Sequence, residues 1–244
     1  MFDLNKWLAL SHYDGALLLS KRSAKLSYAN NVSHKLKWGL SQRDDYFLRR
    51  EAVWTGRAEG ESFLSRRNLH EGRTLLLLEF LDGISLSDFL KSKGRSKRIA
   101  FHVIPFIESL FYELDTLHKK GIVHGDVKAS NVIVSPNGRA RLIDYAAANW
   151  IGSSNDTKPY LITTLSYALP DDYTQTTVLA FVDWHAFFII VDLVNAIPPV
   201  TLKTLSLTDY ISYRQQQLCM TPIDDVIKSK LLEVLDDFRR SLNP

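Results

Sequence analysis

The chain has 244 residues, which is enough for one large domain or for two small lobes with a buried core. Its 30 basic and 27 acidic residues give a net charge of +3, too small an excess to suggest a nucleic-acid partner. A single cysteine, Cys219, excludes an intrachain disulfide framework and a cysteine-based zinc site.

The N-terminus and the apolar runs give no sign of export or of membrane insertion. The first 25 residues lack the order of basic start, apolar core and small-residue cleavage site that marks a secretory signal. The longest apolar runs are far too short to span a bilayer. We therefore expect a cytoplasmic protein without a transmembrane segment.

The first part of the chain reads as short strands with one helix. Strands are predicted at residues 16–20, 25–29 and 32–38, each bounded by turn-like residues. Ser41 followed by Asp44 is a capping signature, and it predicts a helix that runs to about Ala58, with Gly60 as its stop. Residues 73–81 contain four consecutive leucines and predict a buried strand.

A turn at Asp82 and Gly83 separates this part from a mainly helical remainder. Ser85 is expected to cap a short helix that ends near Leu90. Further helices are predicted at 99–119, 180–195 and 222–242, with a strand hairpin at 131–143. The expected fold is therefore α+β, with a small strand-rich N-terminal lobe and a helical C-terminal lobe.

The most informative residues are two short motifs. His124-Gly125-Asp126-Val127-Lys128-Ala129-Ser130-Asn131 is followed by Leu142-Ile143-Asp144-Tyr145-Ala146. Together they resemble the catalytic loop (H-R-D-L-K-x-x-N) and the metal motif (D-F-G) of protein kinases. The context agrees, because a long predicted helix precedes the loop and a predicted hairpin separates the two motifs.

This resemblance implies a phosphotransferase that uses ATP and Mg²⁺. Asp126 would accept or orient the substrate hydroxyl, and Lys128 would contact the γ-phosphate. Asn131 and Asp144 would bind Mg²⁺, since amide and carboxylate oxygens suit this hard ion. A surface turn with an accidental His-x-Asp is the alternative.

The resemblance extends towards the N-terminus. Residues 32–35 resemble the V-A-I-K strand, whose lysine holds the nucleotide phosphates, and favour Lys35 for this role. Lys37 lies on the same face of the strand and competes with it. Glu51, in an apolar helical stripe, is the expected ion-pair partner. Solvated strand lysines and an exposed glutamate are the alternatives.

Three other segments fit the same family. Residues 78–81 resemble the hinge behind adenine, which implies that backbone groups of Glu79 and Leu81 bind the base. Residues 167–171 resemble the A-P-E segment that closes the activation loop. Asp183 resembles the aspartate that ties a buried helix to the catalytic loop, so we expect it to be structural.

The chain also departs from the family. The glycine-rich loop is missing, and Lys21, Arg22 or Lys25 would have to supply phosphate contacts in its place. Gly125 replaces the arginine that would receive an activation-loop phosphate. This predicts a constitutively competent loop, or control by a regulatory protein partner. The helical lobe is truncated, because only about 50 residues follow the helix at 180–195.

Three functions remain open at this point. The first is a minimal bacterial-type serine/threonine protein kinase, formed by one kinase-like domain over residues 1–244 with lobes at 1–81 and 82–244. The second is a kinase-fold enzyme that phosphorylates a sugar or small molecule, as lipopolysaccharide-core kinases do. The third is a pseudokinase that serves as a binding module. Such a reduced kinase also resembles bacterial effectors delivered into host cells.

Overall fold

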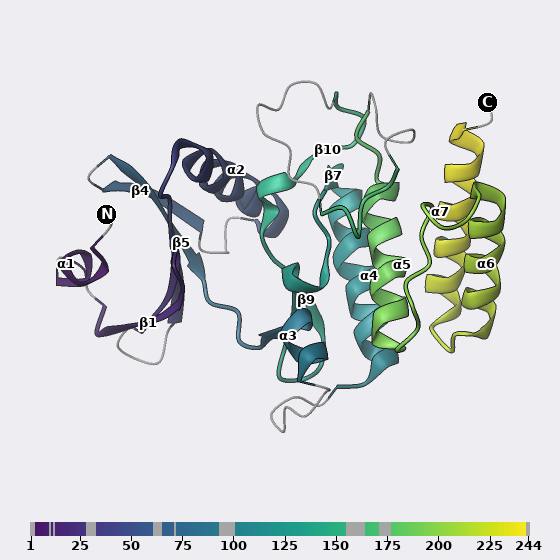
Figure 1. Cartoon of the computed structure of the whole chain (residues 1–244), viewed down its shortest axis with the longest axis horizontal. Helices are drawn as coiled ribbons and strands as arrows, with labels where there is room; N and C mark the ends of the chain where they lie inside the picture. Colours follow the sequence, from purple (N-terminus) through teal and green to yellow (C-terminus); the bar gives the residue numbers. More distant parts are fainter. Residues whose placement is uncertain are drawn as a thin grey trace. The chain divides into compact units, whose positions relative to one another are not determined.

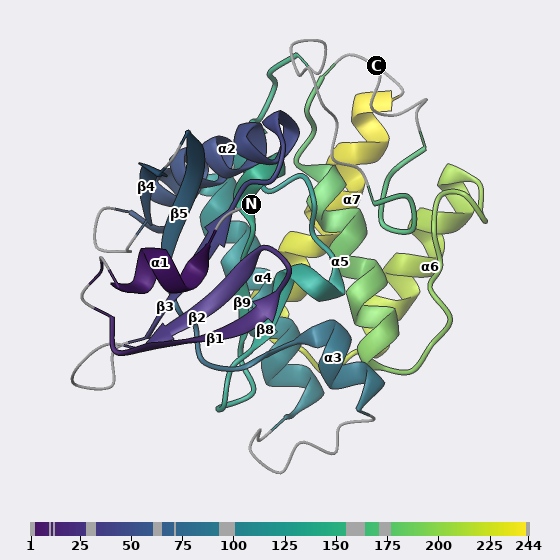
Figure 2. The same cartoon turned by 60° about the vertical axis from the view of Figure 1, so that its left-hand side comes forward.

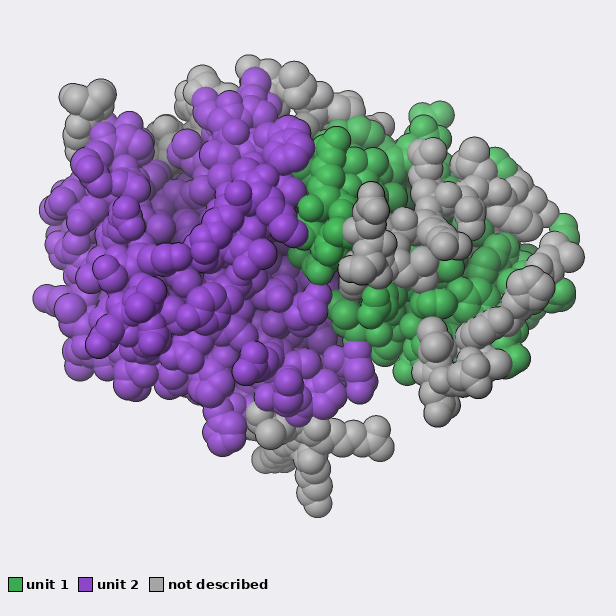
Figure 3. Space-filling view, turned by 180° about the vertical axis from the view of Figure 1, so that it is seen from behind, with its two compact units in different colours: residues 1–81, 144–148 green, residues 82–143, 149–244 purple. Residues whose placement is uncertain are grey.

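The computed structural model describes residues 3–9, 11, 13–27, 33–60, 65–70, 72–92, 101–154, 164–170 and 177–242. The chain forms two compact units (Figure 3). Unit 1 contains residues 1–81 and 144–148, and unit 2 contains residues 82–143 and 149–244. A strand-rich N-terminal part and a helical C-terminal part confirm the α+β fold expected from the sequence.

Unit 1 is built on a five-stranded antiparallel sheet with strand order β1-β2-β3-β5-β4 (Figures 1 and 2). The strands are β1 (Gly15–Ser20), β2 (Ser23–Ser27), β3 (Ser33–Trp38), β4 (Ser65–His70) and β5 (Arg73–Glu79). Helix α1 (Leu4–Ala9) precedes them, and helix α2 (Gln42–Glu59) follows β3.

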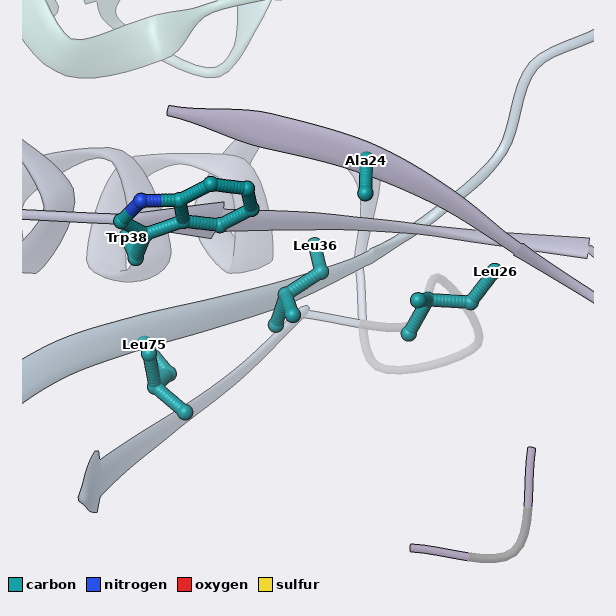
Figure 4. Close-up of a cluster of buried hydrophobic side chains, with 5 residues drawn as sticks. All are labelled: Ala24, Leu26, Leu36, Trp38 and Leu75. Carbon is teal, nitrogen blue, oxygen red and sulfur yellow. The ribbon is translucent and has the colours of Figure 1, made fainter. Parts of the chain in front are cut away.

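The two faces of this sheet are buried by different helices, because side chains alternate along each strand. On one face lie the buried residues Ala24, Leu26, Leu36, Trp38 and Leu75 (Figure 4), against which Leu4, Trp7 and Leu8 of α1 pack. On the other face, Leu76 and Leu78 of β5 pack with Leu48 of α2. Helix α2 is therefore fixed to the face that also carries Lys35 and Lys37.

The ends of α2 follow the signals in the sequence. Ser41 Oγ accepts a hydrogen bond from the Asp44 backbone N–H at 3.1 Å, which confirms the predicted cap. Gly60 ends the helix with φ of 89°, a conformation that a side chain disfavours. This fixed start determines which residues of α2 point towards the sheet, and Glu51 is among the buried ones.

Unit 2 begins with the predicted turn, where Gly83 has φ of 137°. A Cβ atom there would lie 2.3 Å from the Val134 carbonyl oxygen, so the close approach of two backbones requires glycine. Strand β6 (Ile84–Ser85) pairs with β8 (Val132–Val134), which pairs with β9 (Ala140–Leu142). Ser85 caps helix α3 (Leu86–Lys91) by accepting from the Asp88 N–H at 3.1 Å.

The helices of unit 2 form its main body. Helices α4 (Val103–Lys119) and α5 (Phe181–Val194) lie side by side, as do α6 (Leu207–Met220) and α7 (Asp225–Leu242) (Figures 1 and 2). A two-stranded sheet joins β7 (Ile122–Val123) to β10 (Asn149–Trp150). Two short 3-10 turns, at Ala129–Asn131 in unit 2 and at Tyr145–Ala147 in unit 1, overlap the ends of the two sequence motifs.

Helix α5 is the most buried helix of unit 2, and it carries polar groups that need partners. Asp192 is fully buried and forms a two-pronged ion pair with Arg214 of α6, at 2.8 and 2.9 Å. His185 is also fully buried, and its Nδ1 lies 3.0 Å from the Tyr210 hydroxyl. Burial lowers the pKa of His185 to about 3, and the nearby Arg214 charge acts in the same direction.

Some elements were absent from the sequence prediction. Strand β4 reads Ser-Arg-Arg-Asn-Leu-His and has no apolar alternation, so its place in the sheet comes from pairing with β5. Helix α6 was missed because Arg214 occupies a core position of its buried stripe. Among the described residues, no helix has the length and apolar character needed to cross a bilayer.

Candidate active site

Unit 1 contains a buried ion pair between β3 and α2. Lys37 Nζ donates to Glu51 Oε1 at 2.5 Å and to Oε2 at 2.7 Å, and it lies 3.7 Å from Asp144 Oδ2. The sequence favoured Lys35 for this pair, but the structure joins Glu51 to its competitor Lys37. The two lysines share a face and stand roughly 6.6 Å apart along the strand. Only the packing of α2 on the sheet decides which of them meets Glu51.

The two lysines have opposite electrostatic environments. Although burial lowers the pKa of Lys37, the Asp144 and Glu51 carboxylates outweigh it and raise that pKa above its usual range. For Lys35, burial and the neighbouring Lys37 charge lower the pKa. Lys37 is therefore a firmly charged ammonium group held in one place, which is what a phosphate-binding lysine needs.

The segment from Asp144 to Ala148 is held by α2. Arg50 Nε donates to the Ala146 carbonyl at 2.8 Å, and Arg50 Nη2 donates to the Ala148 carbonyl. The Tyr145 hydroxyl donates to Glu59 Oε1 at 2.8 Å. Asp144 itself has φ of 70° and ψ of 66°, in the sparsely populated left-handed region. Strained backbone of this kind persists where surrounding contacts hold it, and it is concentrated at functional sites.

In unit 2, Asp183 fixes the start of the catalytic loop motif. This fully buried carboxylate accepts from the His124 N–H at 2.7 Å, from the Gly125 N–H at 2.9 Å and from His118 Nε2 at 2.9 Å. The expected structural role of Asp183 is thereby confirmed. Gly125 has φ of 75°, so a residue with a side chain would be strained at this position.

His124 connects the loop to the end of the hairpin. Its Nε2 donates to the Ile143 carbonyl at 3.0 Å, and its Nδ1 accepts from the Asp126 N–H at 3.3 Å. These two bonds select the neutral ring with the proton on Nε2. The residue before Asp144 and the backbone of Asp126 are thus tied to one buried side chain.

The Asp126 carboxylate is the centre of a hydrogen-bond network in unit 2. Lys128 Nζ donates to Asp126 Oδ2 at 2.6 Å, and Thr164 Oγ1 donates to Oδ1 at 2.8 Å. Lys128 also donates to Thr164 Oγ1 at 3.0 Å. Asn131 Nδ2 donates to the Asp126 carbonyl at 2.9 Å and to Oδ2 at 3.0 Å. The structure therefore brings two predicted residues, Lys128 and Asn131, to the carboxylate of a third, Asp126.

Asn131 in unit 2 and Asp144 in unit 1 each offer an oxygen atom of the kind that Mg²⁺ binds. The Asn131 amide nitrogen is used by Asp126, so its amide oxygen is the atom oriented away from that bond. Asp144 offers a carboxylate with 39% of its side chain exposed. Within the described residues, no three His, Cys, Asp or Glu side chains gather into a protein-only cage. Mg²⁺ typically takes one or two protein oxygens and fills its other positions with water and phosphate.

The remaining predicted positions lie at the end of β5 and in the segment around Tyr167. Glu79 ends β5 opposite His34, and Leu81 follows it as the last residue of the first segment of unit 1. Their proposed backbone contacts with a base stay a prediction. The Tyr167 hydroxyl accepts from the Ala129 N–H at 3.3 Å, which ties this segment to the catalytic loop. Asp171, in the same motif, lies outside the described residues.

Sequence reasoning missed Thr164 and Arg50. Thr164 stands 38 residues after Asp126 in a segment without regular structure, so no local pattern marks it. Arg50 directly precedes Glu51 and looked like part of a charged helix surface. Its position one residue from a buried glutamate was the available signal that it belongs to the site.

Comparison with known proteins finds relatives of this chain among protein kinases. The family model described as protein kinase domain matches residues 63–239. A probable serine/threonine-protein kinase of Dictyostelium discoideum is 26% identical over 172 residues, which cover 70% of this chain and 26% of that protein. Serine/threonine-protein kinase sid1 of Schizosaccharomyces pombe is 30% identical over 132 residues, 53% of this chain and 27% of its own length.

A bacterial relative shows the same likeness over a shorter stretch. Serine/threonine-protein kinase PknA of Mycobacterium tuberculosis is 32% identical over 104 residues, 41% of this chain and 23% of its own. The chain therefore spans about a quarter of the length of these relatives. Because the family model covers most of the chain, the chain belongs to the protein kinase family of ATP-dependent phosphotransferases.

Proposed function

We propose that the chain is a serine/threonine protein kinase that transfers the γ-phosphoryl group of ATP to a hydroxyl group and requires Mg²⁺. The observation that carries this proposal is the buried Asp126 carboxylate, held by Lys128, Thr164 and Asn131. Burying a carboxylate and fixing its orientation are unfavourable for folding. A fixed carboxylate is, however, what orientation of a nucleophile requires. The names of the relatives support a protein substrate.

The residues of unit 2 would act on the accepting hydroxyl. A carboxylate has about four acceptor positions, and side chains of the described residues use three of those on Asp126. With respect to these residues, one position is left to accept from a serine or threonine hydroxyl and orient its oxygen. Lys128 keeps one N–H beyond its bonds to Asp126 and Thr164, and this cation would offset charge on the transferred group.

The residues of unit 1 would act on the nucleotide. Lys37 would bind the phosphates, and Glu51 would keep its ammonium group in place. Mg²⁺ bound with ATP neutralises charge on the β- and γ-phosphates. Asp144 would offer an oxygen ligand for that ion, as would Asn131 in unit 2. Backbone groups of Glu79 and Leu81 would recognise the adenine base.

Regulation would differ from that of kinases that are switched on by loop phosphorylation. Gly125 has no side chain to receive a phosphate, and its N–H is already bonded to Asp183. We propose a constitutively competent loop or control by a protein partner. The extent of a single kinase-like domain over 1–244, the absence of a nucleic-acid partner and the cytoplasmic location stay predictions.

Phosphoamino-acid analysis after incubation with labelled Mg-ATP tests this proposal. Phosphate on serine or threonine of the chain or of a generic basic protein is the expected result. Tight ATP binding with label only on an added sugar or small molecule would replace the protein substrate by the second function considered above. Absence of both binding and transfer would leave a non-catalytic binding module and refute the proposal.

A further inference from the structure

Residues 164–167 of unit 2 form a tight turn that is bonded at both ends to the catalytic loop. The Tyr167 N–H donates to the Thr164 carbonyl at 2.8 Å and closes the turn. The Thr164 hydroxyl donates to the Asp126 carboxylate, and the Tyr167 hydroxyl accepts from a backbone N–H of the loop. The two central residues of the turn are exposed, and Leu165 exposes 74% of its surface. The turn therefore presents an accessible surface next to the Asp126 network.

A lysine from another segment of unit 2 is bonded to this turn. Lys203 Nζ donates to the Leu165 carbonyl at 2.7 Å. Among the described residues, this carbonyl is the only group that Lys203 Nζ bonds, and no carboxylate lies within ion-pair distance of it. Lys203 is exposed, and an ammonium group has three donors, so two remain after this bond within the same described part. The turn thus carries a cation that no described acid neutralises.

The backbone that carries Lys203 is anchored to the core of unit 2. The fully buried Asp192 accepts from the Val200 N–H at 2.9 Å, and its partner Arg214 donates to the Val200 carbonyl at 2.5 Å. The Lys203 N–H donates to the Thr201 hydroxyl at 3.2 Å. Because both its backbone and its ammonium group are held in place, Lys203 loses less conformational entropy on binding an anion than an untethered surface lysine does.

We propose that Lys203 binds an anionic side chain of the protein substrate, a carboxylate or a phosphate, close to the hydroxyl group that is phosphorylated. The inference rests on the proposed function and adds a substrate class to it, namely proteins whose acceptor serine or threonine has acidic neighbours. Leu165 directly follows Thr164, so Lys203 Nζ lies on the order of 10 Å from the Asp126 carboxylate. An extended peptide spans that distance in about three residues.

Phosphorylation of synthetic peptides by the full chain tests this preference. Each peptide has one acceptor serine in a neutral background, with glutamate, phosphoserine, alanine or lysine at one of the three positions on either side. The parent chain should show a kcat/KM about 3- to 10-fold higher for the best glutamate or phosphoserine peptide than for the alanine peptide. The gain should lie in KM, because Lys203 does not touch the reacting atoms, and it should shrink with added salt. Whichever of the two anions gives the larger gain identifies the source of the charge.

Variants of Lys203 assign the preference to this residue. Lys203→Met should remove it, Lys203→Glu should reverse it towards lysine peptides, and Lys203→Arg should keep it, because arginine keeps the charge. Lys119→Glu is the matched control, since Lys119 is an exposed lysine of α4 that pairs with Asp115. The ratio between peptides is taken within each protein, so a change in overall activity cancels. No preference in the parent chain at any position, or a preference that survives in both Lys203→Met and Lys203→Glu, would overturn the inference.

Binding of the same peptides, measured by fluorescence anisotropy, separates this inference from the proposed function. Transfer to serine without a preference for anionic neighbours supports the kinase and refutes the anion site. Tighter binding of glutamate or phosphoserine peptides that depends on Lys203, without any phosphoryl transfer, supports the anion site and refutes the kinase. A parent chain that neither binds nor phosphorylates any peptide refutes the anion site, and it also refutes the kinase if the chain does not label itself.

Discussion

Replacement of Asp183 by alanine should destabilise unit 2 and loosen the catalytic loop. The carboxylate is fully buried and accepts two backbone N–H groups, from His124 and Gly125, as well as the His118 ring. A donor left without its partner costs about 1–3 kcal/mol, so the two backbone groups alone predict a loss of about 2–6 kcal/mol. Since domains are stable by about 5–15 kcal/mol, this is a large fraction of the total.

Urea denaturation of the full chain measures this loss, and hydrogen exchange locates it. Asp183→Asn keeps one carbonyl acceptor and should lose about half as much free energy as Asp183→Ala. Asp237→Asn, at an exposed i,i+3 pair with Arg240, is the control and should change stability by less than about 0.5 kcal/mol. The amides of His124 and Gly125 should exchange faster in both Asp183 variants. Unchanged protection of these amides with a loss below 0.5 kcal/mol would refute the reasoning.

Three further perturbations test other parts of the structure. Arg50→Met removes the donors to the Ala146 and Ala148 carbonyls, so amides 145–148 should exchange faster, and unchanged exchange would contradict the role of Arg50. Asp192→Ala leaves the Arg214 charge buried without its acid and should cost about 3–5 kcal/mol in urea denaturation, whereas a loss under 1 kcal/mol would argue against the pair. His185 has a pKa lowered to about 3, so the unfolded chain binds the extra proton first, and stability should fall by about 1.4 kcal/mol per pH unit as the pH is lowered from 6.5 to about 3. His185→Gln should flatten that part of the stability profile, and an unaltered slope would assign the acid sensitivity elsewhere.

Local signals in the sequence were sufficient for many elements. The caps at Ser41 and Ser85 depend on contacts three residues apart, and both are present in the structure. The hairpin of β8 and β9 also follows from its own turn residues. In contrast, apolar periodicity failed to predict α6. A buried position of this helix is occupied by Arg214, a charged residue whose partner Asp192 lies on another helix.

In the candidate site, too, some residues could be predicted from the sequence and others could not. The His124–Asn131 motif marks Asp126, Lys128 and Asn131 because they lie on one short loop. The choice between Lys35 and Lys37 depends on how α2 packs against the sheet, and a period of two residues cannot distinguish them. Thr164 reaches Asp126 only through the fold, so it becomes visible as a site residue once the structure places it.

The central claim is that Asp126 serves phosphoryl transfer, and one measurement tests it most directly. Labelled phosphate is followed from Mg-ATP onto the chain itself and onto a generic basic protein, with the parent chain compared to Asp126→Ala. Matched urea curves show that the variant is folded. Transfer to serine or threonine that disappears in Asp126→Ala is the predicted result. Equal labelling by the two proteins, or no nucleotide binding and no transfer by the parent, would contradict the account.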